Sequence, residues 1–430
     1  MRTTRRITAA LAALVLVLTG CSGDGGREDG RITLRFQSLA WQRESVEANR
    51  ELVAEWNAAH PGVRVEYVQG SWGSVHDQLL TSFMGGEAPD IVHDASDDLA
   101  DFAYGGYLAD LRGLLSDRLE ADIPRRSWET TTFGDGVYGV PFLQEPRVLI
   151  ADAARLREAG VRIPTPDDPW TWDEFRSVTK ELSDPDAGRY GVAWPLKEPV
   201  PATLDLSLSA GGRMFHRDAD GKARIRFRAA DAVVPGTVRA QVNTDRSASG
   251  STLGMGGADT LPGFFGGRYA MVPLGFSYRQ QIVQQAPEGF DWQVLPAPAG
   301  ADGLTQGVSP QTLSVAADSP HREEAAAFVD FLLRPGNQVR LALGDWMLPT
   351  GRTALADPAL RTERHGWATG TALAEHLRPA PAQSVRGYPE WQDKIATPAL
   401  QEYYSGAIGL SELRKRLVED GNRVLARYQR

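Results

Sequence analysis

From residue 31 onward the chain alternates between strand and helix patterns, and this alternation limits the folds that it can adopt. Apolar and polar residues alternate over 31–38 with the period of a strand, and 45–60 carries apolar residues at helical spacing. A strand pattern at 63–68, a helix pattern at 75–86 and a short strand pattern at 88–94 follow. Strands that alternate with helices of this length form a parallel sheet with crossover helices. We therefore predict an α/β fold.

The segment WTWDEF at 170–175 carries a specific signal for the start of a helix. Thr171 is a favourable N-cap, and Glu174 three residues later completes a capping box. Trp170 and Phe175 occupy the positions of a hydrophobic staple, so we predict a structural role for Trp170 rather than contact with a ligand. The same periodicities predict further strands at 137–142, 147–152, 190–194, 268–276 and 311–317, and helices at 321–333 and from Ser411 onward.

The only cysteine of the 430-residue chain, Cys21, follows a segment that is typical of protein export. A positively charged start precedes the apolar stretch Ile7–Leu18, which is too short to span a bilayer. The run Leu18–Cys21 resembles the lipobox of bacterial lipoproteins, in which the cysteine carries the lipid. We therefore predict a lipoprotein signal peptide at 1–20 and a flexible tether at 21–30. An ordinary secreted protein with an unmodified cysteine is the alternative.

Length and charge set limits on the rest of the chain. Removal of a 20-residue signal from 430 residues leaves a body that is too long for one hydrophobic core and suits two lobes. The formal net charge is −9, and nucleic-acid binding, which needs a clustered basic surface, is therefore not expected. No apolar run after residue 20 approaches the length of a membrane span. We expect a soluble monomeric body on a lipid anchor.

Sequence templates of common enzymes are absent from the chain. It contains no H-E-x-x-H metal motif, no G-x-S-x-G nucleophile elbow and no G-x-x-x-x-G-K-[ST] phosphate loop. The seven histidines lie without metal-ligand spacing. Paired carboxylates such as Asp97–Asp98 and Asp173–Glu174 fit glycoside hydrolysis in principle, but helix starts attract acidic residues in any case. We therefore predict that the protein is not an enzyme and has no catalytic residue, metal or cofactor.

Aromatic residues follow the predicted strands with unusual regularity. In open α/β sheets, ligands bind beyond the carboxyl ends of the strands, so rings at these positions are expected to meet in a cleft. A flat ring matches the C–H face of a pyranose, and neighbouring carboxylate, amide or guanidinium groups can bind its hydroxyls. For any single ring, packing in a core or loop is the alternative. The rings are Trp41, Trp72, Phe142, Trp194, Phe276, Tyr278 and Trp346.

An ordered set of motifs spans nearly the whole chain after the signal segment. The motifs are LLTSFMGGEAPDIVHD (79–94), FAYGGYLADL (102–111), VYGVPFLQEPRVLIADAARL (137–156), WTWDEF (170–175), FFGGRYAMVPLG (264–275), HREEAAAFVDFLL (321–333) and LPTGRTAL (348–355). Each is weak alone. Together, and after a lipobox, they resemble the extracellular solute-binding proteins of ABC importers, specifically the carbohydrate-binding group that is similar to maltose-binding protein.

The resemblance implies a periplasmic-binding-protein-like fold, in which two α/β lobes joined by a multi-segment hinge close on the ligand like a Venus flytrap. By position, lobe 1 should comprise 31–143 and 308–348, and lobe 2 should comprise 144–307 and 349–430. The chain should cross between the lobes near Pro141–Arg147, Gly307–Thr312 and Pro349.

Ligand contacts in this family come from loops at strand ends, and the resemblance carries them to specific positions here. Two features leave room for alternatives, because Glu145 and Arg147 can pair with each other, and because 196–260 matches the family poorly. The contribution of lobe 2 therefore stays open. The implied contacts are Trp41, Gln42, Trp72, Asp97, Phe142, Glu145, Arg147, Trp194, Phe276, Tyr278 and Trp346.

The function implied by the resemblance is that of a lipid-anchored, extracytoplasmic receptor on the cell membrane. It would capture a sugar or oligosaccharide in the cleft and deliver it to the permease subunits of an ABC transporter. The expected partners are the sugar, the permease and, through a lipid on Cys21, the membrane. A non-sugar solute such as a polyamine, phosphodiester or peptide is the main alternative, and the acids near Asp97 and Glu145 keep a polyamine open. A secreted glycan hydrolase is the alternative outside the binding proteins.

Overall fold

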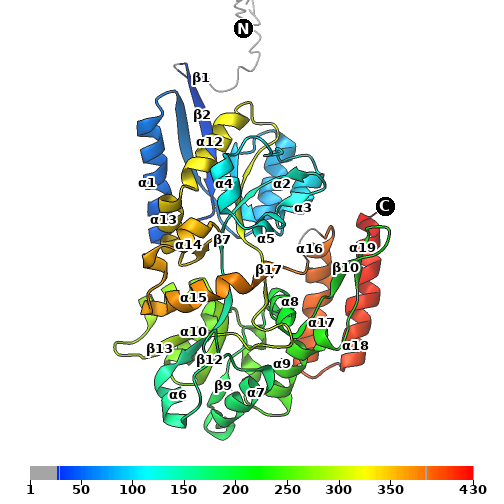
Figure 1. Ribbon diagram of the computed structural model, residues 1–430. Helices are drawn as coiled ribbons and strands as arrows, with labels where there is room; N and C mark the ends of the chain where they lie inside the picture. The colour runs from blue at the N-terminus through cyan, green and yellow to red at the C-terminus, as the bar shows by residue number, and fades with distance from the viewer. Residues whose placement is uncertain (1–26, 29, 383–384, 430) are drawn as a thin grey trace, which may run out of the picture.

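The computed structural model describes residues 27–28, 30–382 and 385–429, which form two α/β lobes one above the other (Figure 1). The predicted signal peptide at 1–20, Cys21 and most of the predicted tether at 21–30 lie outside the described residues. In the part of the chain that is described, we find no helix with the length and apolar character needed to cross a membrane.

Lobe 1 is built on the strand–helix alternation that opens the chain. The strands β2 (Arg31–Ser38), β3 (Val63–Gln69) and β4 (Ile91–Ala95) are parallel, and both β3 and β4 pair with β2. The helices α1 (Arg43–Ala59) and α2 (Val75–Gly85) connect them. The predicted parallel unit is therefore confirmed, with helix ends within a few residues of those expected.

The rest of this sheet is antiparallel, which the strand–helix alternation over 31–94 does not reveal. The strand β15 (Gln311–Val315) lies antiparallel between β4 and β7 (Val140–Gln144). The short strand β16 (Leu348–Pro349) pairs antiparallel with the other side of β7, and β1 (Arg27–Glu28) pairs antiparallel with β2. Both β15 and β16 come from distant parts of the chain, so the helical crossover that forces parallel pairing does not apply to them.

The sheet of lobe 2 has the order β13-β8-β12-β9. Its strands are β8 (Arg147–Asp152), β9 (Tyr190–Val192), β12 (Tyr269–Gly275) and β13 (Trp292–Pro296), of which β12 is buried along its whole length. The helices that pack on these strands are α6 (Ala153–Ala159), α7 (Trp172–Glu181), α10 (Gly257–Phe265) and α15 (Trp367–Leu373).

The C-terminal segment forms a flank beside lobe 2 (Figure 1). It consists of α16 (Tyr388–Trp391), α17 (Thr397–Tyr404), α18 (Leu410–Lys415) and α19 (Gly421–Tyr428). The last predicted helix is interrupted by a π-helical turn between α18 and α19. This flank shares one hydrophobic core with α7, α8 (Pro199–Ser207), α9 (Val233–Asn243), β10 (Phe215–Arg217) and β11 (Ala223–Ile225).

The remaining elements cover lobe 1 or lie between the lobes. Lobe 1 carries α3 (Leu99–Tyr104), α4 (Asp117–Asp122), α5 (Arg125–Trp128), α12 (Arg322–Leu332), α13 (Pro335–Asp345) and the hairpin β5 (Thr132–Phe133) and β6 (Gly136–Val137). The strands β14 (Gln306–Val308) and β17 (Leu377–Pro379) pair in parallel, α11 (Arg279–Gln285) follows β12, and α14 (Arg352–Leu355) follows β16.

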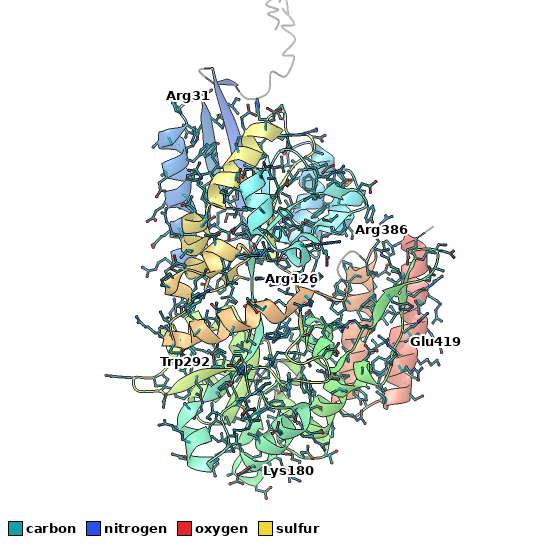
Figure 2. The ribbon with its side chains drawn as sticks, viewed as in Figure 1. Arg31, Arg126, Lys180, Trp292, Arg386 and Glu419 are labelled. Atoms are coloured by element: carbon teal, nitrogen blue, oxygen red, sulfur yellow. The ribbon has the colours of Figure 1, made fainter. Side chains whose placement is uncertain are left out.

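Three segments carry the chain between the two sheets. The first joins β7 directly to β8, the second joins β14 to β15, and the third follows β16. Contacts outside these segments also bridge the lobes. The side chain of Arg126 on α5, which lies between the lobes in Figure 2, donates to the carbonyl of Ala374 over 3.4 Å. Gln280 Nε2 donates to Glu44 Oε2 over 2.8 Å.

The start of α7 follows the predicted capping box in detail. Thr171 Oγ1 accepts a hydrogen bond from the backbone N–H of Glu174 over 3.1 Å, and Glu174 Oε2 accepts one from the N–H of Thr171 over 2.8 Å. The ring of Trp170 is buried and stacks on Phe175 with ring centres 6.5 Å apart. The predicted structural role of Trp170 is confirmed.

We predict that Thr171→Ala lowers the free energy of unfolding by about 1 kcal/mol, because the N–H of Glu174 loses its acceptor at the helix start. Urea unfolding followed by circular dichroism measures this change. Thr171→Ser, which keeps the hydroxyl, should unfold within a few tenths of a kcal/mol of the parent. Equal unfolding midpoints for the Ala and Ser variants would contradict the role of the cap.

Candidate functional site

A cavity of about 150 Å³ lies where the two lobes face each other. Lobe 1 contributes Asp97, which follows β4, and the passage from β7 to β8 contributes Glu145 and Arg147. Asp205 on α8 and Tyr388 on α16 complete its polar lining. The cavity therefore brings together groups from distant parts of the chain, as a ligand-binding site between two lobes requires.

A second cavity of about 290 Å³ adjoins the first and shares Arg147, Pro201 and Gly275 with it. Its further lining includes the predicted contacts Trp194 and Tyr278. Most of the other lining residues are apolar, namely Pro195, Leu196, Ala202, Leu206, Pro273 and Leu274. The two cavities together form a hollow with three carboxylates at one end and a mixed apolar and charged lining at the other.

Arg147 is held in place from two sides. Its Nε donates to Asp205 Oδ2 over 3.0 Å, which ties the crossing segment to α8. Its backbone N–H donates to Gln306 Oε1 over 2.9 Å, and its carbonyl accepts from Gln306 Nε2 over 3.1 Å. The side chain and the backbone are thus bound by different elements, and the guanidinium is presented to the cavity in one orientation.

Glu145 does not pair with Arg147 in the structure, so that sequence alternative was wrong. Glu145 Oε2 instead accepts a hydrogen bond from the backbone N–H of Ser277 over 2.8 Å. A glycine is needed beside it, because a Cβ at Gly275 would lie only 2.7 Å from Glu145 Oε1. Arg147 has its partner in Asp205, which leaves the carboxylate of Glu145 at the wall of the cavity without a cation.

Burial shifts the protonation of the two aspartates in this cavity. Burial raises the pKa of Asp205 to about 7, although the guanidinium of Arg147 opposes this rise. Nearby protein atoms of both lobes also raise the pKa of Asp97 to about 6 by desolvation. The side chain of Asp97 is nevertheless exposed, so water at the opening of the cavity reduces the cost of desolvating its charge. Asp205, which is buried, is therefore the more strongly perturbed of the two aspartates.

More acidic residues lie behind Asp97 on lobe 1. His76 Nδ1 lies 3.1 Å from Asp98 Oδ1, and this hydrogen bond raises the pKa of His76. Its ring stacks on Phe102 with ring centres 4.9 Å apart. Asp94, at the end of β4, is buried, and desolvation raises its pKa. The lobe 1 wall is therefore acidic beyond the residue that lines the cavity.

Three predicted ligand contacts are buried in separate cores, which corrects the expectation that all the rings meet in one cleft. Phe142 belongs to the core of lobe 1. Trp194 is buried in the main core of lobe 2, where its Nε1 donates to Gln241 Oε1 over 2.8 Å, although it also borders the second cavity. Phe276 is fully buried with its ring 3.2 Å from the guanidinium carbon of Arg279. Phe142, Trp194 and Phe276 are therefore part of the hydrophobic cores of their lobes.

Four other predicted contacts line neither cavity. Trp41 is exposed, and Gln42 is buried just before α1. Trp72 is half-buried with its ring edge-on to a histidine, and Trp346 is half-buried and stacks on Trp367 with ring centres 6.0 Å apart. Their contact with a ligand stays a prediction. Of the remaining predicted contacts, Asp97, Glu145 and Arg147 line the first cavity and Tyr278 lines the second.

Sequence reasoning missed two residues of the cavity. Asp205 stands between Leu204 and Leu206 on a mostly buried helix, and a charged residue in such a helix was the signal that could have found it. Tyr388 follows a segment with no regular pattern, and nothing nearby in the sequence marks it. Among the described residues, no group of three or more histidine, cysteine or acidic side chains is arranged to hold a metal ion.

Sequence comparison identifies relatives over most of the chain. Residues 41–339 match the family described as bacterial extracellular solute-binding protein. An uncharacterized lipoprotein in the oleD 5′ region of Streptomyces antibioticus is 75% identical over 415 residues, which is 96% of this chain and 91% of that protein. A multiple sugar-binding protein of Streptococcus mutans is 19% identical over 338 residues, covering 75% of this chain and 76% of that protein.

Solved structures with the same fold are also found. The sugar-binding protein MalE of Xanthomonas citri has a TM-score of 0.80 at 23% identity, covering 92% of this chain and 98% of that chain. The GacH receptor of Streptomyces glaucescens, solved unliganded and with acarbose, has a TM-score of 0.77 at 20% identity over 92% and 98% of the two chains. With the two-lobed fold and the sequence match in agreement, the chain belongs to the family of bacterial extracellular solute-binding proteins.

Proposed function

We propose that this protein is a lipid-anchored, extracytoplasmic receptor that captures a sugar or oligosaccharide between its lobes and delivers it to the permease of an ABC importer. The observation that carries the proposal is the first cavity, which hydrogen-bonding groups of both lobes line, together with the adjoining second cavity on lobe 2. Structural relatives that bind sugars, such as MalE of Xanthomonas citri, support the choice of ligand class. The lipoprotein relative in Streptomyces antibioticus supports the anchor.

The residues around the cavity suit a polyhydroxylated ligand. Carboxylates at Asp97, Glu145 and Asp205 accept hydrogen bonds from hydroxyls, and the guanidinium of Arg147 donates them. The ring of Tyr278 and the apolar walls of the second cavity offer flat surfaces to the C–H face of a sugar ring. No step in this mechanism makes or breaks a covalent bond.

Binding is coupled to lobe closure through the three crossing segments. A ligand that touches Asp97 on one lobe and Asp205 on the other gains both sets of contacts only when the lobes are together. The ligand therefore shifts the equilibrium toward the closed form by the difference between its affinities for the closed and open forms. Such domain closure about a few backbone segments is a hinge motion, and the closed form is the one presented to the permease.

A panel of neutral and amino-substituted mono- and oligosaccharides tests this function. We predict that isothermal titration calorimetry of the purified protein detects saturable binding to at least one member of the panel. Small-angle scattering should show a smaller radius of gyration with that sugar, because the lobes close around it. No binding across the panel would contradict the proposal.

The half-buried tryptophans test the predicted ring contacts. We predict that Trp72→Ala and Trp346→Ala each weaken sugar binding by about 1 kcal/mol, or about fivefold in Kd, through loss of stacking on the sugar. Trp292→Ala is a matched control, because Trp292, labelled in Figure 2, is a half-buried ring on β13 that is not among the predicted ligand contacts. Melting temperatures separate loss of stability from loss of binding. Unchanged affinity in both variants would refute these two contacts.

The lipid anchor has its own test. We predict that Cys21→Ala releases the protein from the membrane fraction into the medium of the producing cells, because the residue that carries the lipid is lost. Detergent phase partitioning of the two forms measures the change. If parent and variant partition identically, the protein is secreted without an anchor.

A further inference from the structure

The first cavity has an excess of negative charge. Three carboxylates line it, those of Asp97, Glu145 and Asp205, against the single guanidinium of Arg147. Among the described residues, only Asp205 of these three acids has a basic side chain within 4 Å, and that partner is Arg147 itself. Asp97 has the hydroxyl of Ser309 and Glu145 has the N–H of Ser277, and both of these partners are uncharged. Asp97 and Glu145 therefore face the cavity with no basic side chain of the described residues within 4 Å. Arg147 attracts Asp97, and Arg279 attracts Glu145, only from beyond that distance.

Three basic side chains near the cavity, those of His76, Arg386 and Arg279, have their close partners elsewhere. On lobe 1, His76 is engaged by Asp98, and Asp94 and Asp101 add further acids. Arg386 lies over the ring of Tyr104, with its guanidinium carbon 5.3 Å from the ring centre, and it is exposed at the edge of the C-terminal flank (Figure 2). Arg279 is buried and donates to three backbone carbonyls, those of Phe276, His365 and Trp346.

Two side chains at the cavity wall are at least nine-tenths buried, and each has a polar atom that stays open to the cavity. Tyr388 is only 8% exposed, and its hydroxyl makes no hydrogen bond with any described residue. Asp205 is only 9% exposed, and while its Oδ2 binds Arg147, its Oδ1 accepts no hydrogen bond from the described residues. Neither atom is enclosed by protein, so a ligand can reach both: the carboxylate oxygen accepts from a donor of the ligand, and the tyrosine hydroxyl can accept or donate.

The excess of negative charge is confined to the first cavity. The second cavity has two basic side chains, Arg147 and Lys197, and one acidic side chain, Glu198, so it has no excess of negative charge. A linear polyamine carries positive charge along its length and would need carboxylates along the whole hollow. A ligand with one cationic group on a larger uncharged body fits the observed distribution.

We propose that the solute is a sugar that carries a protonated amino group, and that this group lies in the first cavity between Asp97, Glu145 and Asp205. This inference rests on the proposed function and narrows its substrate class. An ammonium group has donors and no acceptor, so it satisfies the unpaired carboxylate oxygens directly. Charge-assisted hydrogen bonds of this kind are about twice as strong as neutral ones.

Matched sugars that differ in one group test the inference. The pairs are glucosamine and glucose, galactosamine and galactose, and the β1,4-linked glucosamine trimer and cellotriose. In each pair the first sugar has an amino group in place of one hydroxyl per ring. The titrations are made at about pH 7, where amino groups like α-amino groups are mostly protonated and Asp97, with a pKa of about 6, is mostly ionised. We expect the amino member of at least one pair to bind on the order of tenfold more tightly.

The possible results separate this inference from the proposed function. If a neutral sugar binds as tightly as its amino partner or more tightly, the protein is a sugar receptor and the amino-sugar inference is wrong. If spermidine binds and no sugar does, both the inference and the proposed function are wrong. If only amino members bind, both stand.

Substitutions of the cavity aspartates test where the amino group of the sugar binds. We expect Asp97→Asn and Asp205→Asn to remove most of the preference for the amino member, because each deletes one negative charge from the cavity. Glu181→Gln, an exposed change at the end of α7, is the matched control and should keep the full preference. Thermal melts show whether each variant folds. Asp205→Asn removes the ion-pair partner of Arg147, and if this variant does not fold, Asp97→Asn alone decides the test. Full preference in Asp97→Asn would overturn the inference.

Discussion

The structure depends on one extended segment that belongs to both lobes. Residues Val140–Gln144 pair with β15 and β16 in one sheet, and Arg147–Asp152 pair with β12 and β13 in the other. Only Glu145 and Pro146 separate the two strands, and the carbonyl of Pro146 accepts from the N–H of Phe276 over 3.1 Å. Side chains two apart in extended backbone point the same way, so Glu145 and Arg147 both face the cavity.

The other two crossings are fastened to this segment. Gln306, on the second crossing, makes two hydrogen bonds to the backbone of Arg147. Thr350, on the third, donates from Oγ1 to the carbonyl of Pro141 over 2.7 Å and from its N–H to the carbonyl of Phe142 over 3.0 Å. The three crossings therefore form one hydrogen-bonded bundle between the lobes. Under the proposed function, lobe closure would change the cavity mainly by moving Asp97 and the α8 residues relative to that bundle.

Local patterns made individual elements of both lobes predictable from sequence, while long-range contacts decided the site. The capping box at Thr171 and the alternation over 31–94 depend on neighbours in the chain, and both were read correctly. A ring at a strand end can pack inward or face the cleft, and spacing does not distinguish these, which is why Phe142 and Phe276 proved to be core residues. Tyr388 reaches the cavity only because the C-terminal flank folds back beside α8.

The buried ion pair between Arg147 and Asp205 is better explained by binding than by stability. Taking two charges out of water costs several kcal/mol, and apolar residues of similar size often stabilise a fold as well or better. Here burial still raises the pKa of Asp205 to about 7 despite its partner, so the fold bears a cost for this charge. Under the proposed function, a donor-rich cationic group of the ligand would offset that cost, and a ligand without one would leave acceptors unpaired. Sites with unpaired buried polar groups reject such ligands more strongly than apolar pockets do, so these charges would then serve selectivity.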